Sequence, residues 1–173
     1  MKQSNDFTDN EWTAIITDVK KLFENLPAVT PAKGIPGNGG EVLKIDDQEG
    51  NPPVADDKTI FFNGAGFPDA DHETFELTKK KTEFCFCKTA RKPYDLAVQA
   101  CMLIAWYHAP NTIRISSDGY PEEWTAAAKL LTSIGVPLFT VENCARLAAS
   151  GAKYPLVKAI AVLILKEANN AQN

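Results

Sequence analysis

The residues best suited to chemistry are basic side chains placed just before a long apolar stretch: Lys88, Arg91 and Lys92. Pro93 follows them and is a favourable first-turn residue, so the cluster lies where a helix is predicted to begin. A helix start carries unpaired N–H groups and positive potential, which disfavour cations unless an anion shares the site. Two anions fit this position: Asp95 in the first turn, or a phosphate or carboxylate group of an external ligand.

An acidic run around a histidine, residues 69–73, leads into a predicted strand. Carboxylates beside a histidine are able to coordinate a divalent metal, and a histidine is able to act as a general base. The other histidine, His108, ends a predicted helix and supplies no metal-binding pair. Asp-rich loops before strands also commonly form turns. The run is therefore either a turn or the centre of a metal-dependent enzyme, with His72 as the base and Asp71 or Glu73 holding the metal.

Ser117 and Asp118 belong to a Ser-Ser-Asp-Gly run, residues 116–119, between a predicted strand and a predicted helix. Ligands commonly gather at strand ends in sheet-based folds. A nucleophilic serine needs a base, but neither histidine lies near this run in sequence, and the Gly-x-Ser-x-Gly pattern of hydrolases is absent. A turn in which Ser117 or Asp118 caps the next helix is the simpler interpretation.

Other conspicuous residues favour structural roles. The glycine-rich segment 34–40 lacks the Lys-Ser/Thr ending of a phosphate loop. Cys85 and Cys87 face one side of a predicted strand, but a zinc ribbon needs a second cysteine pair of its own and the sequence has none. We expect three aromatic residues in the core or at a partner surface: Trp106, Tyr107 and Trp124. No metal and no cofactor is predicted.

The best-marked element is a helix near the N-terminus. Thr8 is its predicted N-cap, and Glu11 completes a capping box. Phe7 and Trp12 have the spacing of a hydrophobic staple across the helix start. Apolar residues then recur at helical spacing until Pro27 ends the helix.

Alternating apolar residues and short turns predict an antiparallel meander in the middle of the chain. Its strands are expected at Glu41–Asp46, Thr59–Asn63, Glu73–Thr78 and Phe84–Cys87, with a further strand at Asn111–Ser117. Helices are predicted at Pro93–His108, at Pro121–Ile134, from the Thr140 cap to about Ser150, and from Pro155 onward. Apolar residues fill the helix that precedes His108, so we expect it to be central.

The predicted fold class is α+β, with an antiparallel meander of four or five strands packed against a central helix. One domain is expected, with additional helices at both ends. Its parts are an N-terminal helix (1–26), a Pro/Gly-rich linker (27–40), the α+β core (41–134) and a C-terminal helical pair (138–173).

Composition limits the functional classes. The chain has 173 residues, 45% hydrophobic and 23% charged, which is typical of a globular domain. Its net charge of −4 argues against strong non-specific binding to nucleic acid. The N-terminus has no signal-peptide pattern, and the apolar stretch Ala159–Leu165 is too short to span a membrane. We therefore expect a cytoplasmic protein with reduced cysteines.

Four segments together resemble motifs of a known family. They are Phe-Asn-Gly (62–64), His-Glu-Thr-Phe (72–75), Phe-Cys-Lys-Thr-Ala-Arg-Lys-Pro-Tyr-Asp (86–95), and Ser-Ser-Asp-Gly (116–119) followed by Trp124. In these residues the chain resembles small bacteriophage- and prophage-associated proteins of unknown function, over about residues 59–134. The resemblance implies a phage-related origin, hence the cytoplasm of a bacterial host, and specifies no activity.

These observations predict an accessory protein without catalytic activity that binds an anionic small molecule or the acidic surface of a partner. The expected binding residues are Lys88, Arg91, Lys92, Tyr94, His72, Ser117 and Asp118. The alternative is the metal-dependent hydrolase or phosphate-transfer enzyme described above. A second alternative is a structural phage component whose aromatic faces join copies of the chain into a homo-oligomer.

Overall fold

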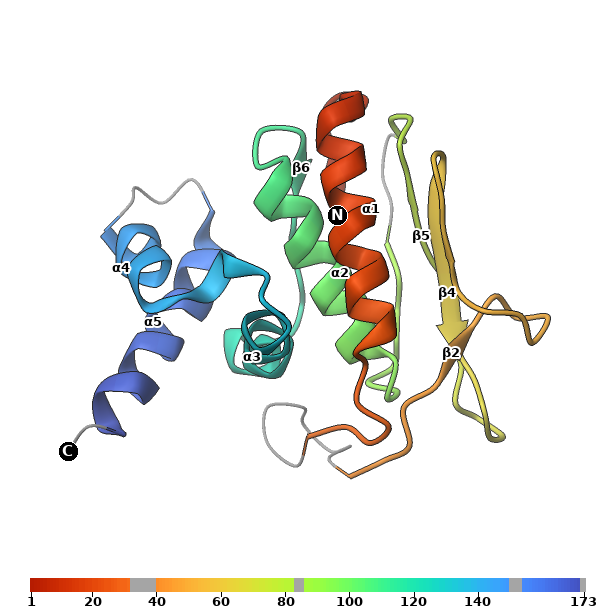
Figure 1. Cartoon of the computed structure of the whole chain (residues 1–173). Coiled ribbons are helices and arrows are strands. Elements are labelled where there is room, and N and C mark those ends of the chain that lie inside the picture. Colours follow the sequence, from red (N-terminus) through yellow and green to blue (C-terminus); the bar gives the residue numbers. More distant parts are fainter. Residues whose placement is uncertain (32–39, 83–85, 150–153, 172–173) are drawn as a thin grey trace.

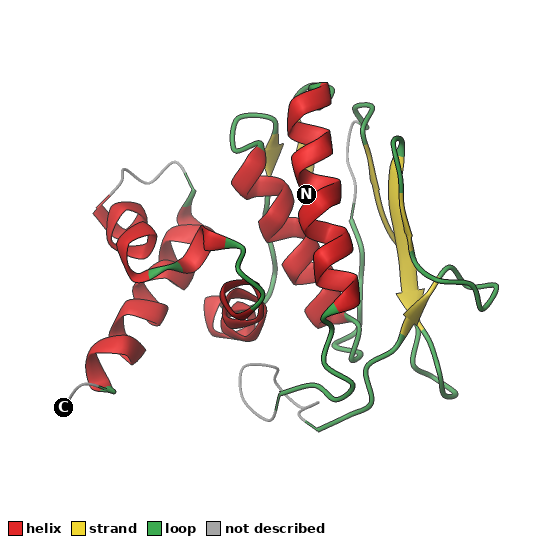
Figure 2. Cartoon of the chain, viewed as in Figure 1, coloured by secondary structure: helices red, strands yellow, loops and turns green. Residues whose placement is uncertain are grey.

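Most of the structure is helical (Figure 2). The strands form a main sheet on one side of the molecule and a separate short ladder. The structure is a computed structural model that describes residues 1–31, 40–82, 86–149 and 154–171. Its strand pairings are antiparallel, so the predicted α+β class is confirmed.

Helix α1 (Asp9–Glu24) begins as its sequence predicts. Thr8 Oγ1 accepts a hydrogen bond from the Glu11 N–H, and Glu11 Oε2 accepts one from the Thr8 N–H. The rings of Phe7 and Trp12 lie 5.5 Å apart. The capping box and the hydrophobic staple are therefore both present, and they set the position at which the helix starts.

Helix α2 (Asp95–His108) lies in the middle of the molecule, as its apolar sequence predicts. Ten of its side chains are buried, and Gln99 is the only one of them that carries an amide. Helix α1 packs along α2. His108 Nε2 lies 2.7 Å from Asp18 Oδ2, which joins the end of α2 to the middle of α1.

Strand β4 (Thr59–Gly64) is central to the main sheet. Strands β3 (Val54–Ala55) and β5 (Phe75–Thr78) pair with overlapping residues of β4, so they lie along its two edges. Strand β2 (Ile45–Asp46) pairs with the carboxyl end of β4. All pairings are antiparallel, as predicted. The strands contribute four large side chains to the core: Ile60, Phe62, Phe75 and Leu77.

The strand predicted at residues 111–117 is shorter and lies elsewhere. It is β6 (Ile113–Arg114), which pairs with β1 (Lys2–Gln3) in a separate two-stranded ladder. Lys2 stands opposite Arg114 in this ladder. The partner comes from the other end of the sequence, and the local alternation of apolar residues does not specify such a partner.

The predicted strand Phe84–Cys87 lies partly outside the described residues, which resume at Phe86. Phe86 and Cys87 belong to no strand, so the prediction is wrong for this part. Cys87 is half-buried, and its Sγ donates to the Glu73 carbonyl at 3.2 Å. This segment runs beside residue 73 without a regular ladder.

The C-terminal part is helical, as predicted. Its elements are η1 (Pro121–Trp124), α3 (Thr125–Ser133), η2 (Pro137–Phe139), α4 (Val141–Ala149) and α5 (Pro155–Asn170). Gly135, with φ +77°, follows α3 and ends it. Thr140 Oγ1 accepts from the Asn143 N–H at 3.3 Å and so caps α4 as the sequence predicts.

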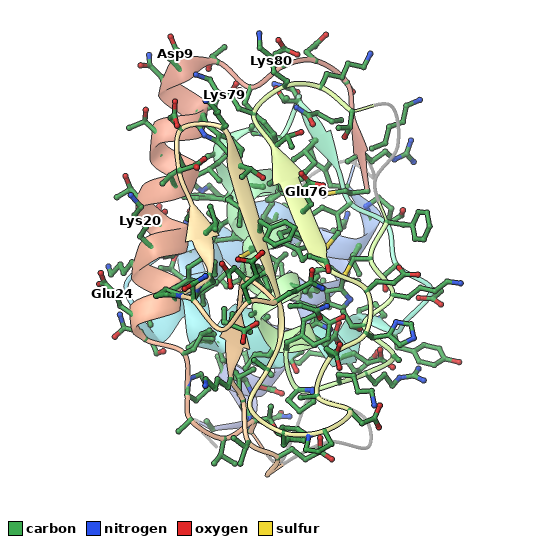
Figure 3. All side chains as sticks on the ribbon, turned by 90° about the vertical axis from the view of Figure 1, so that its right-hand side faces the viewer. Asp9, Lys20, Glu24, Glu76, Lys79 and Lys80 are labelled. Carbon is green, nitrogen blue, oxygen red and sulfur yellow. The ribbon has the colours of Figure 1, made fainter. Side chains whose placement is uncertain are left out.

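The elements form layers (Figure 1). The main sheet lies on one side, α1 and α2 lie beside it, α3 follows, and α4 and α5 pack together on the far side. Lys79, at the end of β5, lies 2.5 Å from Asp9 at the start of α1 (Figure 3). Buried apolar side chains from all five α-helices and the sheet belong to one cluster. No described helix has the length and apolar character needed to span a membrane.

Candidate functional site

The segment before α2 contains an unusual turn. Ala90 and Arg91 have φ values of +50° and +58°, and the Lys92 N–H donates to the Thr89 carbonyl at 2.9 Å across them. A turn with two positive φ angles normally contains glycine or asparagine. Each non-glycine residue in this conformation costs about 1 kcal/mol or more. Strain of this kind is concentrated at binding sites and active sites, so the turn deserves a functional explanation.

Groups of the protein itself form hydrogen bonds around the start of α2. The Asp95 N–H donates to the Lys92 carbonyl at 2.9 Å. The Asp95 carboxylate accepts hydrogen bonds from Thr89 Oγ1 at 2.7 Å and from Gln99 Nε2 at 2.8 Å. These hydrogen bonds keep the Asp95 carboxyl beside the first turn of α2, but the N-cap Tyr94 makes no side-chain cap there.

Burial governs the chemistry of Asp95. Loss of solvent raises the pKa of its carboxyl, and the nearby Glu123 carboxylate raises it further. The Thr89 hydrogen bond, the charge of Arg91 and the Gln99 hydrogen bond act in the opposite direction, but the net pKa shift is upward. Asp95 therefore holds its proton more tightly than a carboxyl in water.

The three basic side chains do not act as one cluster. An Arg91 guanidinium nitrogen lies 3.4 Å from Glu123 Oε1, and Lys92 Nζ lies 2.6 Å from Asp69 Oδ2. Lys88 is exposed and makes no ion pair with a described carboxylate. Of the three, Lys88 retains a charge without a protein counterion.

A cavity of about 870 Å³, here called the large cavity, lies beside this turn. Segments far apart in sequence line it: residues around 72–76, the turn with the start of α2, and the stretch from Ser116 to Trp124. Five predicted binding residues are among its lining residues: His72, Lys88, Arg91, Ser117 and Asp118.

Two predicted binding residues lie outside the lining of the large cavity. Lys92 is turned toward Asp69. Tyr94 is buried, and its hydroxyl donates to the Glu73 carbonyl at 2.6 Å. Burial raises the pKa of the Tyr94 hydroxyl, which therefore stays protonated and serves as a structural donor.

A buried asparagine positions His72. Asn63 Nδ2 donates to the His72 carbonyl at 3.1 Å and to Thr74 Oγ1 at 3.2 Å. The next residue, Gly64, approaches the chain so closely that a Cβ there would lie 2.0 Å from the Ala70 carbonyl oxygen. The loop between β4 and β5 is thus held against the end of β4, and His72 is placed at the cavity by backbone contacts.

The side chains of His72 and Glu73 both contact backbone groups of Lys88. His72 Nδ1 lies 2.6 Å from the Lys88 carbonyl, which only accepts, so Nδ1 carries the hydrogen. Glu73 Oε2 accepts from the Lys88 N–H at 2.7 Å. Among the described residues no group of three or more His, Cys, Asp and Glu side chains is arranged to hold a metal ion. These contacts agree with the interpretation of residues 69–73 as a structured turn.

Ser117 forms a local turn, because its Oγ accepts from the Gly119 N–H at 3.0 Å. A Cβ at Gly119 would lie 2.4 Å from Glu123 Oε2, so this glycine lets Glu123 approach the turn. Trp124 is buried. The turn predicted at residues 116–119 is present, and it forms part of the cavity wall. The predicted helix cap is wrong: the N-cap of η1 is Tyr120, and neither Ser117 nor Asp118 caps this element.

The helices contribute polar side chains to the cavity wall that were not among the predicted binding residues. Gln99 Oε1 is buried and has no hydrogen-bond partner among the described residues. Four carboxyl groups line the large cavity, those of Glu76, Asp95, Asp118 and Glu123, against the two basic residues Lys88 and Arg91. The predicted basic site is therefore a site of mixed charge. An amide in an otherwise apolar helix was the available signal for Gln99.

Comparison of the chain with models of known protein families, with curated proteins and with solved structures yields no match. The function is therefore inferred from the geometry of the site.

Proposed function

We propose that the protein binds a small polar molecule in the large cavity, as an accessory protein without catalytic activity. The observation that carries the proposal is Gln99, a residue of the cavity wall whose buried amide oxygen has no hydrogen-bond partner among the described residues. A buried acceptor without a donor costs about 1–3 kcal/mol, and such groups are rare in folded proteins. A ligand donor reaches this oxygen once the Gln99 side chain rotates toward the cavity, and the new hydrogen bond would then remove the cost.

The charges of the wall define the ligand further. Lys88 has no described counterion, and Arg91 is held in place by its turn and by Glu123. These two residues support the anionic group that the sequence predicts. The carboxyl of Asp95 and the amide oxygen of Gln99 accept hydrogen bonds and support N–H or O–H donors. A ligand with one anionic group and at least one donor fits both, whereas a multiply charged anion would meet the carboxylates.

The size of the large cavity agrees with this class of ligand. Sites for small organic molecules typically measure about 300–1,000 Å³. The large cavity, at about 870 Å³, lies within this range. A role in a bacteriophage, which the residue resemblance implies, belongs to the same proposal and rests on the resembling residues alone.

Protein-observed ¹H–¹⁵N NMR with polar fragments, grouped as anions, cations and zwitterions, tests the proposal. We expect zwitterions, and anions that carry donors, to bind best and to shift the backbone signals of residues 86–99. Lys88→Ala should weaken this binding about tenfold, the effect of losing one charged hydrogen bond. Lys92→Ala is the matched control, because Lys92 lies outside the cavity lining and should leave the affinity unchanged. Equal affinities of the two variants, or no fragment that shifts these signals, would contradict the proposal.

A further inference from the structure

The wall of the large cavity contains aromatic rings as well as polar groups. Phe75 and Trp124 are only 1% and 3% exposed, so they close the wall and present little surface to a ligand. Phe86 differs from both, because it lines the cavity and is 62% exposed. The Phe86 ring is therefore accessible to a ligand in the cavity.

Contacts with the loop before β5 hold the segment that carries Phe86. Cys87 Sγ donates to the Glu73 carbonyl at 3.2 Å, and the Lys88 N–H donates to Glu73 Oε2 at 2.7 Å. The Lys88 carbonyl lies 2.6 Å from His72 Nδ1. The two residues that follow Phe86 are thus fixed, and their contacts limit where the Phe86 ring lies.

The same contacts place a second ring in the wall. His72 is exposed and lines the large cavity, and its contact with the Lys88 carbonyl fixes the imidazole next to this segment. Met102, which is half-buried, lines the cavity from α2. Methionine adapts its shape to a neighbouring ring and makes favourable sulfur–aromatic contacts. The accessible part of the wall thus offers flat and adaptable apolar surfaces beside its charges.

A positive charge is available close to Phe86 in the sequence. Lys88 follows it by two residues, lines the same cavity and is exposed. Lys88 makes no ion pair with a described carboxylate. One short segment, residues 86–88, therefore presents both an aromatic ring and a cation to the cavity.

From these observations we infer that the ligand of the large cavity carries an aromatic ring linked to its anionic group, and that Phe86 recognises the ring. Aromatic rings pack on one another in offset or edge-to-face arrangements that depend on their π electrons, which a saturated ring lacks. Phe86 is then a specificity-determining residue, and Lys88 binds the anionic end. The inference rests on the proposed function and adds the class of ligand: an aromatic anion with a hydrogen-bond donor, of which an aromatic amino acid is a simple example.

Phenylalanine and cyclohexylalanine are a matched pair of probes for this inference. Both are zwitterions of the same length, and they differ only in whether the six-membered ring is aromatic. The saturated ring is the more apolar, so burial of apolar surface alone would favour cyclohexylalanine. Titrations of the full chain, followed in ¹H–¹⁵N NMR spectra, measure the two affinities. We expect phenylalanine to bind about threefold to tenfold more tightly.

Substitution of Phe86 decides whether this preference comes from its ring. Phe86→Leu keeps an apolar side chain but removes the ring, so the preference for phenylalanine should disappear. Phe67→Leu is the matched control, because Phe67 is 41% exposed and lies outside the cavity lining, and the preference should remain. Equal affinities of the two probes for the wild type, or a preference that survives Phe86→Leu, would overturn the inference.

The titrations also separate this inference from the proposed function. If neither amino acid binds while other polar fragments shift the signals of residues 86–99, the inference is wrong and the proposed function stands. If no polar fragment of any kind shifts these signals, the proposed function is wrong and the inference fails with it.

Discussion

Ala90 and Arg91 hold a backbone conformation that glycine adopts far more readily. Their turn brings the Arg91 guanidinium to Glu123 and leaves Lys92 facing Asp69. The direction of each basic side chain therefore follows from the turn. A sequence without glycine at these two positions does not indicate a turn of this type, so the separation of the three basic residues was not predictable.

Replacing Ala90 with glycine should relieve part of the strain in this turn. We expect Ala90→Gly to raise the free energy of unfolding by about 1 kcal/mol, measured by urea denaturation. Ala145→Gly is the matched control: Ala145 is exposed within α4, where glycine should lower the stability by about 1 kcal/mol. Two changes of the same sign would contradict the left-handed assignment at Ala90.

Asp95 gives the site a pH dependence of a definite sign. Its pKa is raised in the folded protein, so the folded state binds the proton more tightly than the unfolded state does. The contribution of Asp95 to stability is therefore greatest at low pH. It decreases as the pH rises from the unfolded-state pKa of about 3.9 through the higher folded-state pKa.

Asp95→Asn should abolish this dependence. Rotation of the Gln99 amide would turn its unpartnered Oε1 toward the new side-chain amide, so the buried hydrogen bonds need not be lost. We expect the stability of the variant relative to the wild type to increase from pH 4 upward and then to level off. Urea denaturation of both proteins over this pH range measures the difference. A difference that stays constant or decreases with pH would show that Asp95 is not perturbed in this way.

At the scale of the elements, Gly64 fixes the loop between β4 and β5 against the sheet. A Cβ at this position would lie 2.0 Å from the Ala70 carbonyl oxygen and 2.8 Å from the Tyr94 ring. Neither atom belongs to a flexible side-chain end, so the backbone would have to move. The loop carries His72 to the large cavity, and its position therefore depends on this glycine.

Gly64→Ala should destabilise the protein by about 3 kcal/mol, the upper part of the usual range for an overpacked core. Gly50→Ala is the control, because Gly50 has φ +87° but open space around its Cβ position. The control should lose only about 1 kcal/mol, from backbone strain alone. Thermal or urea denaturation compares the two variants, and equal losses would argue against the close approach at Gly64.

Some elements are specified by local sequence patterns, and others by pairing between segments far apart in the sequence. The capping box of Thr8 and Glu11 is local, and it predicts the start of α1 correctly. The apolar run of α2 likewise predicts a central helix. The β1–β6 ladder joins the two residues after Met1 to residues 113–114, and local sequence does not encode that pairing. Long-range pairing decided where the predicted strand at 111–117 lies.

At the scale of the whole molecule, contacts join segments that the sequence motifs had marked. Asn63 bonds His72, His72 bonds Lys88, and Arg91 pairs with Glu123, beside Trp124. The sequence identified most of these segments, and five of its seven predicted binding residues line the large cavity. The balance of acidic and basic groups in the site depends on tertiary packing. Packing places four carboxyl groups in a site that was predicted to be basic.

The architecture explains why polar groups occur in the wall of the large cavity beside apolar side chains such as Phe75 and Trp124. One wall comes from the sheet side, in which Glu76 lies on β5 (Figure 3). The others come from the start of α2 and from the chain that leads into α3. These segments meet at their ends, where backbone groups and turn residues replace the apolar faces of the helices. A ligand that carries both polar groups and apolar surface therefore fits this lining.

The most direct test of the central claim is a crystal structure with the best-binding fragment. We predict ligand density within hydrogen-bonding distance of both Gln99 Oε1 and Lys88 Nζ. A fragment bound elsewhere, with Gln99 Oε1 bonded to another protein group, would contradict the account.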